Sequence, residues 1–424
     1  MGQGAVKMRR IVFLAVAIMT IWNAALATAN AYMPEGKFIR YDEAGLNRLR
    51  QAAKSEAVES VLVKSLGSHA NWQMKQPIQF VAEKTGSADF FANGGTKNDY
   101  ASLSIYYWPD ASTPFGLPYI YKDGLINPER ADLSRYDAIR LEKMVSAVAT
   151  LSTAYYVTRQ EEYAQRAVLW LRTWFVYPMS RMNPHLNFAQ SVPGKAAGTP
   201  AGIIETVGFI QIIDAAMMLE DYPGWTEEDK DALRHWFKAY LRWLADSPLG
   251  IREKAANNNH GVWYDAQIAA YAYYIGDTDL MRSVIGKNAY ARIHKQIRPT
   301  GEMPLEMSRT RSLHYVLYNL RAFVTLARLA EKVGVNLWDY ETEDGRGIKK
   351  ALDYAVPYVL GEKEWQRHSV VPEKEHIAAV YLAMAGNHFR SERYLSAAVT
   401  LLGDPAGFQA VAVRSFSRSF PGGR

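Results

Sequence analysis

The feature that most constrains the fold of this 424-residue chain is the spacing of its apolar residues. In segment after segment an apolar side chain recurs at about every third or fourth position, which is typical of a helix with a buried face. Alternating patterns that would indicate strands are few. We therefore predict an all-α fold, with helices over residues 43–66, 135–157, 161–175, 202–219, 227–246, 259–275, 279–297, 312–333, 347–360, 377–384 and 392–402.

Several of the predicted helices are joined in pairs by similar turns. Near Ala154, Ala272 and Leu382 an apolar helix ends, a short turn with polar residues or glycine follows, and a second helix begins. Repeated helical hairpins bury their apolar faces by stacking on their neighbours. A stack that curves round becomes an (α/α) toroid, so we predict an incomplete barrel of helical hairpins, formed as a single domain by residues 32–424.

Two long segments, residues 92–127 and 181–200, lack helical spacing and hold many turn formers. Loops of this length in a compact protein are usually functional, and we expect them to lie over a cleft at one rim of the toroid. The first loop contains Tyr106, Tyr107 and Trp108, whose rings either stack on a sugar or anchor the loop to the helices.

The first 31 residues have the three parts of a secretory signal peptide. Lys7, Arg9 and Arg10 precede an apolar run of about fifteen residues, which is short for a membrane anchor, and small residues follow. We predict cleavage after Ala31, with Ala27 as the second choice. The expected location is periplasmic or secreted, with no membrane association after cleavage.

Charge and cysteine content exclude several classes of function. The formal net charge is +6, half of it in the predicted signal peptide, and the chain has no basic block of the kind that follows nucleic acid. A mildly positive balance suits a polyanionic substrate instead. The absence of cysteine excludes disulfides, thiolate metal sites and a cysteine nucleophile.

Two stretches concentrate polar side chains at predicted helix starts. The first, EKAANNNHGVWYDAQ, holds Asn259 and His260 and has more asparagine than a helix cap needs. The second, EMPLEMSRTRSLHYVLYNL, holds Arg309, Arg311 and Tyr315. The sequence has no phosphate loop, dinucleotide fingerprint, Gly-x-Ser-x-Gly elbow or His-Glu-x-x-His motif that would indicate another chemistry.

Amide, imidazole, guanidinium and phenol groups together suit β-elimination on a uronate polymer. Asparagine, neutral histidine and arginine can offset the charge of the substrate carboxylate while the adjacent C5 proton is removed. A base takes that proton and an acid protonates the departing C4 oxygen, and one tyrosine can do both when the two lie on the same side. The positive end of a helix dipole favours a neutral His260 and lowers the pKa of Tyr315.

The stretches NNHGVWYD and PLEMSRTRSLHY, with DYASLSIYYWPD upstream, resemble the bacterial alginate lyase family, in its branch of exported (α/α)-toroid lyases that act on polymannuronate and polyglucuronate. The resemblance covers about residues 99–329. It implies that Asn259, His260 and Arg309 hold the substrate carboxylate and that Tyr315 acts as base and acid.

The sequence departs from this family after the histidine. Well-known alginate lyases carry Asn-Asn-His-Ser-Tyr-Trp, whereas Gly261 and Val262 follow the histidine here. Helical spacing places Arg311 and Tyr315 on one face, so Arg311 is also predicted to contact the substrate. The complete set of predicted substrate contacts is Arg311, His314, Trp263, Tyr106, Tyr107, Trp108, Asn183, Asn187 and Gln190.

We therefore predict a polysaccharide lyase that cleaves β-1,4-linked mannuronate or glucuronate polymers, in which the C5 hydrogen and the C4 oxygen are syn. No metal, other cofactor or obligate protein partner is expected. One alternative is an inverting glycoside hydrolase on the same toroid, with its two carboxylates drawn from Glu205, Asp265 and Glu306. A second alternative is a non-catalytic polysaccharide-binding protein of a secretion system.

Overall fold

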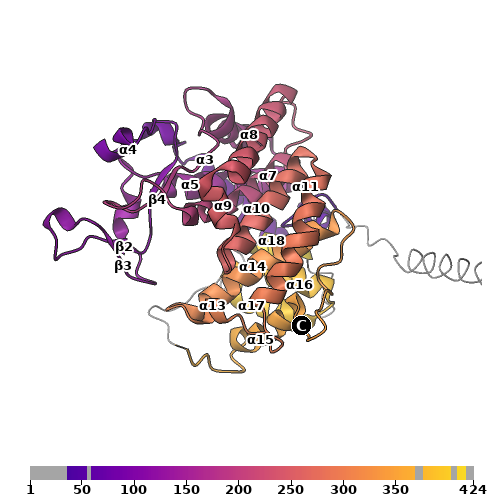
Figure 1. The fold of residues 1–424 in the computed structure, drawn as a ribbon. Coiled ribbons are helices and arrows are strands. Elements are labelled where there is room, and N and C mark those ends of the chain that lie inside the picture. The colour runs from indigo at the N-terminus through magenta and orange to yellow at the C-terminus, as the bar shows by residue number, and fades with distance from the viewer. Residues whose placement is uncertain (1–35, 55–58, 368–375, 403–407, 417–424) are drawn as a thin grey trace, which may run out of the picture.

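The computed structural model describes residues 36–54, 59–367, 376–402 and 408–416. The predicted signal peptide and its cleavage sites lie outside these residues. Helices make up most of the described chain, as Figure 1 shows, so the all-α prediction is confirmed. The larger of two apolar core clusters extends from Phe38 to Phe416 and joins the N-terminal and C-terminal helices, and the smaller one includes Leu103 and Tyr119.

Seven helices contact one another in succession and return to the first, which makes a closed ring and confirms the (α/α) toroid. In the order of contact they are α5 (Ala138–Thr158), α7 (Phe209–Met218), α10 (Asn259–Ile275), α14 (Ser312–Glu331), α16 (Ala378–His388), α18 (Phe408–Phe416) and α2 (Glu43–Ala52). Most ring helices bury side chains on every face, because neighbours surround them on all sides. The run Pro200–Met218 is apolar enough to span a membrane, but 61% of its most apolar window is buried inside the protein.

A second set of helices packs on the outside of the ring. These are α3 (Glu59–Met74), α6 (Glu161–Leu171), α8 (Glu227–Asp246), α11 (Thr278–Ser283), α12 (Tyr290–Gln296), α15 (Ile348–Val359) and α17 (Glu392–Leu402). In α8 the side chains of Leu233, Phe237, Tyr240 and Leu244 are buried, so the helix presents one apolar stripe to the ring. The predicted hairpins are present as the packed pairs α5–α6, α10–α11 and α16–α17.

Some predicted helix boundaries are wrong. The predicted helix 43–66 corresponds to two helices, because α2 ends at Ala52 and α3 begins at Glu59. Three predicted helices include tighter or wider turns, named η4 (Arg172–Val176), η5 (Pro200–Gly208) and η6 (Val284–Ala289). Such changes of helical pitch leave the apolar spacing nearly unchanged, so the sequence pattern does not reveal them.

The long loops form a layer at one side of the ring, which Figure 1 shows beside the helical body. Strand β1 (Ala101–Leu103) pairs in parallel with β4 (Phe188–Ser191), and β2 (Tyr107–Trp108) pairs antiparallel with β3 (Ile120–Tyr121). Short helices complete the layer and the connections: η1 (Val81–Glu83), α4 (Ala88–Ala92), η2 (Pro114–Gly116), η3 (Pro128–Ala131), α9 (Pro248–Lys254) and α13 (Pro304–Met307).

A buried ion pair attaches this loop layer to the ring. The carboxylate of Asp137, immediately before α5, lies 2.9 Å from Lys84 Nζ and accepts a hydrogen bond from the backbone N–H of Ala101. Burial raises the pKa of Asp137 to about 6 although Lys84 opposes the shift. The start of β1 is thereby held against α5, which fixes the base of the loop that carries Tyr106 and Tyr107.

Candidate active site

A cavity of about 680 Å³ lies where the loop layer meets the first turns of α10 and α14. It is lined by residues from seven segments: Ser104, Ile105, Tyr106, Tyr107, Tyr121, Gln190, Thr199, Pro200, Ala201, Ile204, Arg252, Glu253, Ala256, Asn258, Asn259, His260, Arg309, His314, Tyr315 and Tyr318. Its volume is within the range of ligand-binding pockets. The two stretches that the sequence singled out therefore meet in one cavity.

His260 is the second residue of α10 and lies at the cavity wall. Asn258 caps this helix by accepting a hydrogen bond from the backbone N–H of His260. The His260 Nδ1 atom lies 2.6 Å from Glu253 Oε1, on a carboxylate that is 3% exposed. A carboxylate only accepts, so Nδ1 carries the proton and Nε2 is the ring nitrogen left for a ligand.

Asn259 lines the cavity and is also bonded to a buried carboxylate. Its backbone N–H and its side-chain Nδ2 donate to the two oxygens of Glu306, at 2.6 and 2.7 Å. Both residues are almost fully buried, and burial raises the pKa of Glu306 although the two Asn259 donors oppose the shift. In this arrangement one of the two N–H groups on Nδ2 of Asn259 is used by Glu306, and the other makes no hydrogen bond to a described residue.

Gly261 explains the departure of the motif from its family pattern. A Cβ atom at this position would lie 2.2 Å from the carbonyl oxygen of Ala256 and 2.4 Å from Arg292 Nη1. Arg292 is fixed there because it is paired with the buried Asp265 at 2.9 Å. A serine after His260 would therefore require the backbone of the preceding turn to move.

The hydroxyl of Tyr315, in the first turn of α14, lies between two hydrogen-bonding partners. Arg309 Nη2 donates to it at 2.9 Å, and the Tyr106 hydroxyl lies 2.7 Å away. The Arg309 guanidinium also covers the phenol ring, 3.8 Å from its centroid. The tyrosine therefore touches a fixed positive charge and a second phenol from the loop layer.

Asp123, next to β3, fixes the position of Arg309. Its carboxylate accepts from Arg309 Nε and Nη2 and from the backbone N–H and hydroxyl of Thr310. Burial acts to raise the pKa of Asp123, but Arg309 and Thr310 outweigh it and hold the pKa well below its usual range. Asp123 thus stays ionised and joins the β2–β3 hairpin to the segment before α14.

The structure corrects the expected pKa of Tyr315. The helix start was predicted to lower it, but burial raises it, and the neighbouring Tyr106 raises it further. Arg309 lowers it, but by less than the loss of hydration raises it. Burial of this side chain could not be read from its position at a helix start.

Four further residues predicted to contact substrate lie at the cavity: Tyr106, Tyr107, Gln190 and His314. Gln190 has a backbone φ of 46°, in the left-handed region that non-glycine residues rarely adopt. Its backbone N–H donates to Ser102, which helps to hold this conformation. Strain of this kind is common at ligand-binding positions.

Five residues predicted to contact substrate do not line the cavity. Trp263 is 1% exposed and packs on Tyr318 as a core residue, and Arg311, the residue before α14, is absent from the cavity wall. Trp108 donates to the carbonyl of Leu125. The remaining two, Asn183 and Asn187, bond Asp99 and Trp243.

The sequence analysis missed Glu253, Asp123 and Asn258. Asn258 stands in the quoted motif, but the family resemblance directed attention to its neighbour Asn259. Glu253 lies seven residues before His260, where the turn between α9 and α10 folds it back. Asp123 is 186 residues from Arg309, and nothing in the sequence pairs the two. Within the described residues, no cluster of three acidic, histidine or cysteine side chains could hold a metal ion.

Comparisons with known proteins agree on one family. A family model described as alginate lyase matches residues 88–365. A crystal structure of an alginate lyase from Bacteroides ovatus superposes with a TM-score of 0.82 at 34% identity, covering 89% of this chain and 99% of that chain.

More distant structures share the fold. Alginate lyase A1-III from Sphingomonas species A1 has a TM-score of 0.50 at 15% identity, over 78% of this chain and 88% of that chain. A histidine-to-alanine variant of alginate lyase A1-III complexed with tetrasaccharide gives 0.53 at 15% identity, over 85% and 88%. Comparison with curated proteins gives no match.

Proposed function

Since this chain belongs to the alginate lyase family, we infer that it is a polysaccharide lyase acting on uronate polymers of the alginate type. The observation that carries this function is the shared cavity, in which His260, Arg309 and Tyr315 meet from two helix starts. An imidazole, a guanidinium and a phenol converge there on a space large enough for sugar residues.

We propose that His260 and Asn258 neutralise the carboxylate of the reacting uronate. Glu253 occupies Nδ1 of His260, so Nε2 is directed to the ligand. Asn258 lines the cavity, and within the described part of the chain its Nδ2 makes no hydrogen bond. With Nδ1 donating to Glu253, Nε2 donates to the substrate carboxylate when the ring is doubly protonated. An imidazolium and the Asn258 amide would together spread the charge that develops when C5 loses its proton.

Tyr315 is the proposed base and acid. As phenolate it takes the C5 proton, and as phenol it returns that proton to the C4 oxygen, leaving a 4,5-unsaturated uronate at the new end. Arg309 stabilises the phenolate from 2.9 Å, and the Tyr106 hydroxyl can donate to it from 2.7 Å. The hydrogen bonds that Arg309 makes to other described residues use Nε and Nη2. Its Nη1 is therefore left to donate to the substrate carboxylate.

Because the pKa of Tyr315 is raised, the activity should increase with pH. At neutral pH most of the tyrosine is protonated, so the reactive phenolate is a minor species. We expect kcat/KM to increase as pH rises from about 7 to about 9 because the ionised fraction grows. Initial rates over this range, followed by the ultraviolet absorbance of the unsaturated product, measure the effect.

The decisive variant is Tyr315→Phe. It removes the ionisable hydroxyl while keeping the ring, so turnover should fall by about a thousandfold or more, while calorimetric binding of an oligomannuronate stays close to normal. Tyr177→Phe, at an exposed position outside the cavity, serves as the matched control. If Tyr315→Phe keeps most of the activity, the base assignment is wrong.

The structure gives little support to the hydrolase alternative. Glu205 is bonded to Tyr100 and Ser102, and neither Asp265 nor Glu306 lines the cavity. Among the described residues of the cavity wall, Glu253 carries the carboxylate, and it holds His260. Hydrolysis would give products without enoate absorbance, and binding without turnover on every polymer would favour the binding-protein alternative.

We propose that the substrates are β-1,4-linked mannuronate or glucuronate polymers, because one tyrosine serves both the proton and the leaving oxygen when they are syn. A panel of polymannuronate, glucuronan, polyguluronate and hyaluronan tests this substrate range. Product from the first two, and little from polyguluronate, is expected. Faster turnover of polyguluronate would contradict a single-tyrosine mechanism.

We also propose that the protein is exported, on the basis of its N-terminal sequence. In a bacterial host the mature protein should appear in the periplasm or medium and begin at Tyr32. N-terminal sequencing of the secreted form measures this, and a full-length chain retained in the membrane fraction would contradict it.

A further inference from the structure

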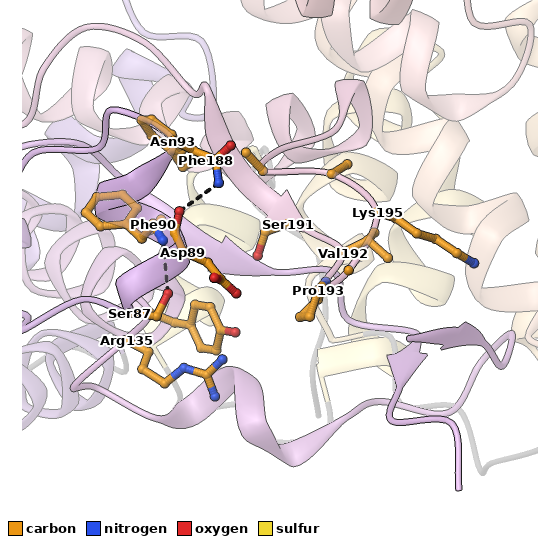
Figure 2. Close-up of a pocket in the computed structure, with 15 residues that line it drawn as sticks. Ser87, Asp89, Phe90, Asn93, Arg135, Phe188, Ser191, Val192, Pro193 and Lys195 are labelled. Carbon is orange, nitrogen blue, oxygen red and sulfur yellow. Dashed lines mark hydrogen bonds between the residues drawn. The ribbon is translucent and has the colours of Figure 1, made fainter. Parts of the chain in front are cut away.

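A second cavity, of about 370 Å³, lies in the loop layer between α4 and the turn that follows β4 (Figure 2). Its size is at the lower end of the range for ligand pockets. It is separate from the catalytic cavity but built from the same loops. Gln190 and Ser191 are consecutive in β4, and the first lines the catalytic cavity whereas the second lines this one.

Two oppositely charged side chains line this cavity and do not form an ion pair with each other. Asp89 and Arg135 are both at its wall, and neither side chain makes a hydrogen bond or ion pair with another described residue. Figure 2 shows both side chains at the pocket. The Arg135 guanidinium is supported instead by the ring of Tyr136, 4.9 Å from its centroid. A ligand with both hydroxyl donors and a carboxylate acceptor would use both charges.

An apolar wall accompanies these charges. Phe90 and Phe188 both line the cavity and pack edge to face, with ring centroids 5.0 Å apart. Aromatic surface next to a few polar groups suits a sugar ring, whose C–H faces are apolar and whose edges carry hydroxyls. A uronate residue combines this apolar face with the hydroxyls and the carboxylate that the wall can bind.

The turn after β4 connects the two cavities. Lys195 lines the second cavity, yet its Nζ lies 5.9 Å from the ring centroid of Tyr107, which lines the catalytic cavity. In the view of Figure 2, Lys195 extends away from Phe90, to the far side of the pocket. An exposed positive charge therefore stands between the two cavities, where an anionic polymer that leaves the first could be led to the second.

We propose that this cavity is an accessory subsite for a uronate residue of the same polymer, remote from the bond that is cleaved. In it Arg135 binds the carboxylate, Asp89 accepts from ring hydroxyls, and Phe90 with Phe188 contacts the sugar face. The proposal rests on the lyase function above, because it takes its substrate class from that function. It predicts that affinity increases with chain length.

The test measures KM and kcat on oligomannuronates of increasing length for the unaltered protein and for Arg135→Gln. This change removes the charge but keeps most of the side-chain stem over Tyr136. We expect KM for long oligosaccharides to rise roughly fivefold, the scale of an exposed charge-assisted contact, with kcat unchanged. For the shortest oligosaccharide that is still cleaved, both constants should match those of the unaltered protein.

Matched variants separate charge from packing. Arg135→Lys keeps the charge and should retain much of the long-chain affinity. Arg282→Gln, at an exposed position of α11 on the side opposite α4 in Figure 1, should change nothing. Equal effects of Arg135→Gln on short and long substrates, or no effect on either, would overturn the subsite.

Calorimetry makes the outcome independent of turnover. Binding of long oligomannuronate to Tyr315→Phe is compared with binding to the double variant Tyr315→Phe/Arg135→Gln. Weaker binding by the double variant supports the subsite, and equal binding overturns it. If the unaltered protein cleaves no uronate polymer, the proposed function fails, and the calorimetric comparison still decides whether the second cavity binds a uronate chain.

Discussion

At the scale of single residues, the reacting side chains are held by buried or half-buried carboxylates that the substrate need not touch. Glu253 holds Nδ1 of His260, and Asp123 holds Nε and Nη2 of Arg309. Glu253 uses one nitrogen of the imidazole and Asp123 uses two of the guanidinium, and in each group another nitrogen is left for the cavity. The orientation of the imidazole and of the guanidinium is therefore set before substrate arrives, which favours reaction because less reorganisation is needed.

A residue-scale prediction concerns Glu253→Gln. The amide oxygen of glutamine can still accept a hydrogen bond from Nδ1 of His260, but it carries no negative charge. The imidazole is then held less firmly, and its doubly protonated form, which donates from Nε2, loses the neighbouring charge. We expect kcat/KM to fall by about ten- to hundredfold, the value of a hydrogen bond to a charged group. Steady-state rates on polymannuronate measure this change.

Glu161→Gln, exposed at the start of α6, is the matched control and should leave kcat/KM unchanged. The melting temperature of both variants shows whether the fold is intact. If Glu253→Gln loses stability but keeps kcat/KM per folded molecule, Glu253 supports α9 and not the chemistry.

At the scale of elements, the site forms where two helix starts meet a hairpin. The first turns of α10 and α14 supply His260 and Tyr315, and these two helices pack side by side in the ring. The β2–β3 hairpin is joined to the segment before α14 through Asp123, Arg309 and Thr310. The rigid ring thus sets the distance between base and imidazole, and the hairpin closes the cavity over them.

An element-scale prediction concerns Asp123→Asn. The amide keeps the shape of the side chain but loses the charge, and one of its ends is a donor that faces the donors of Arg309. Arg309 should then leave its place over Tyr315, and we expect kcat to fall about tenfold. Asp110→Asn, in the same hairpin and bonded to Ser112, is the control and should leave kcat unchanged.

Limited proteolysis complements these rates. If the charge of Asp123 holds the hairpin, Asp123→Asn should be cleaved faster between β2 and β3 than the unaltered protein or Asp110→Asn. An unchanged kcat together with unchanged proteolysis would mean that Arg309 and the hairpin keep their positions without this ion pair.

At the scale of the whole molecule, stability depends on closure of the ring between its first and last helices. Helix α18 packs on both α2 and α16. At the contact, a Cβ atom on Gly45 of α2 would lie 1.8 Å from the carbonyl oxygen of Ser415 in α18. Only a glycine lets the two backbones approach this closely, so the closure of the toroid depends on this position.

A whole-molecule prediction follows for Gly45→Ala. The added methyl group should force α18 away from α2 and lower the free energy of unfolding by about 1–3 kcal/mol. Gly67→Ala in α3 is the matched control, because a Cβ there meets nothing within 4 Å. It should raise stability by about 0.5–1 kcal/mol. Urea denaturation of both variants measures these effects. Equal stabilities would show that the contact between α2 and α18 is not tightly packed.

Much of the architecture could be predicted from the sequence, because helix formation and burial are recorded in local spacing. Helices α8, α10 and α17 match their predicted ranges, and α8 begins with a capping box formed by Thr226 and Asp229. His260, Arg309 and Tyr315 could also be found in the two motifs, since each motif is a short run at a helix start. Local chemistry was sufficient for these features.

Contacts between distant segments were decided by the tertiary structure alone. The sequence determined which residues form helices and which short motifs carry imidazole, guanidinium and phenol. The fold decided that Asp123 pairs with Arg309, that Trp263 is core, and that burial raises the pKa of Tyr315 where its helix position predicted the reverse. The physical reason is that hydration and charge pairing depend on every neighbour in space, whereas spacing along the chain reports neighbours within a few turns of one helix.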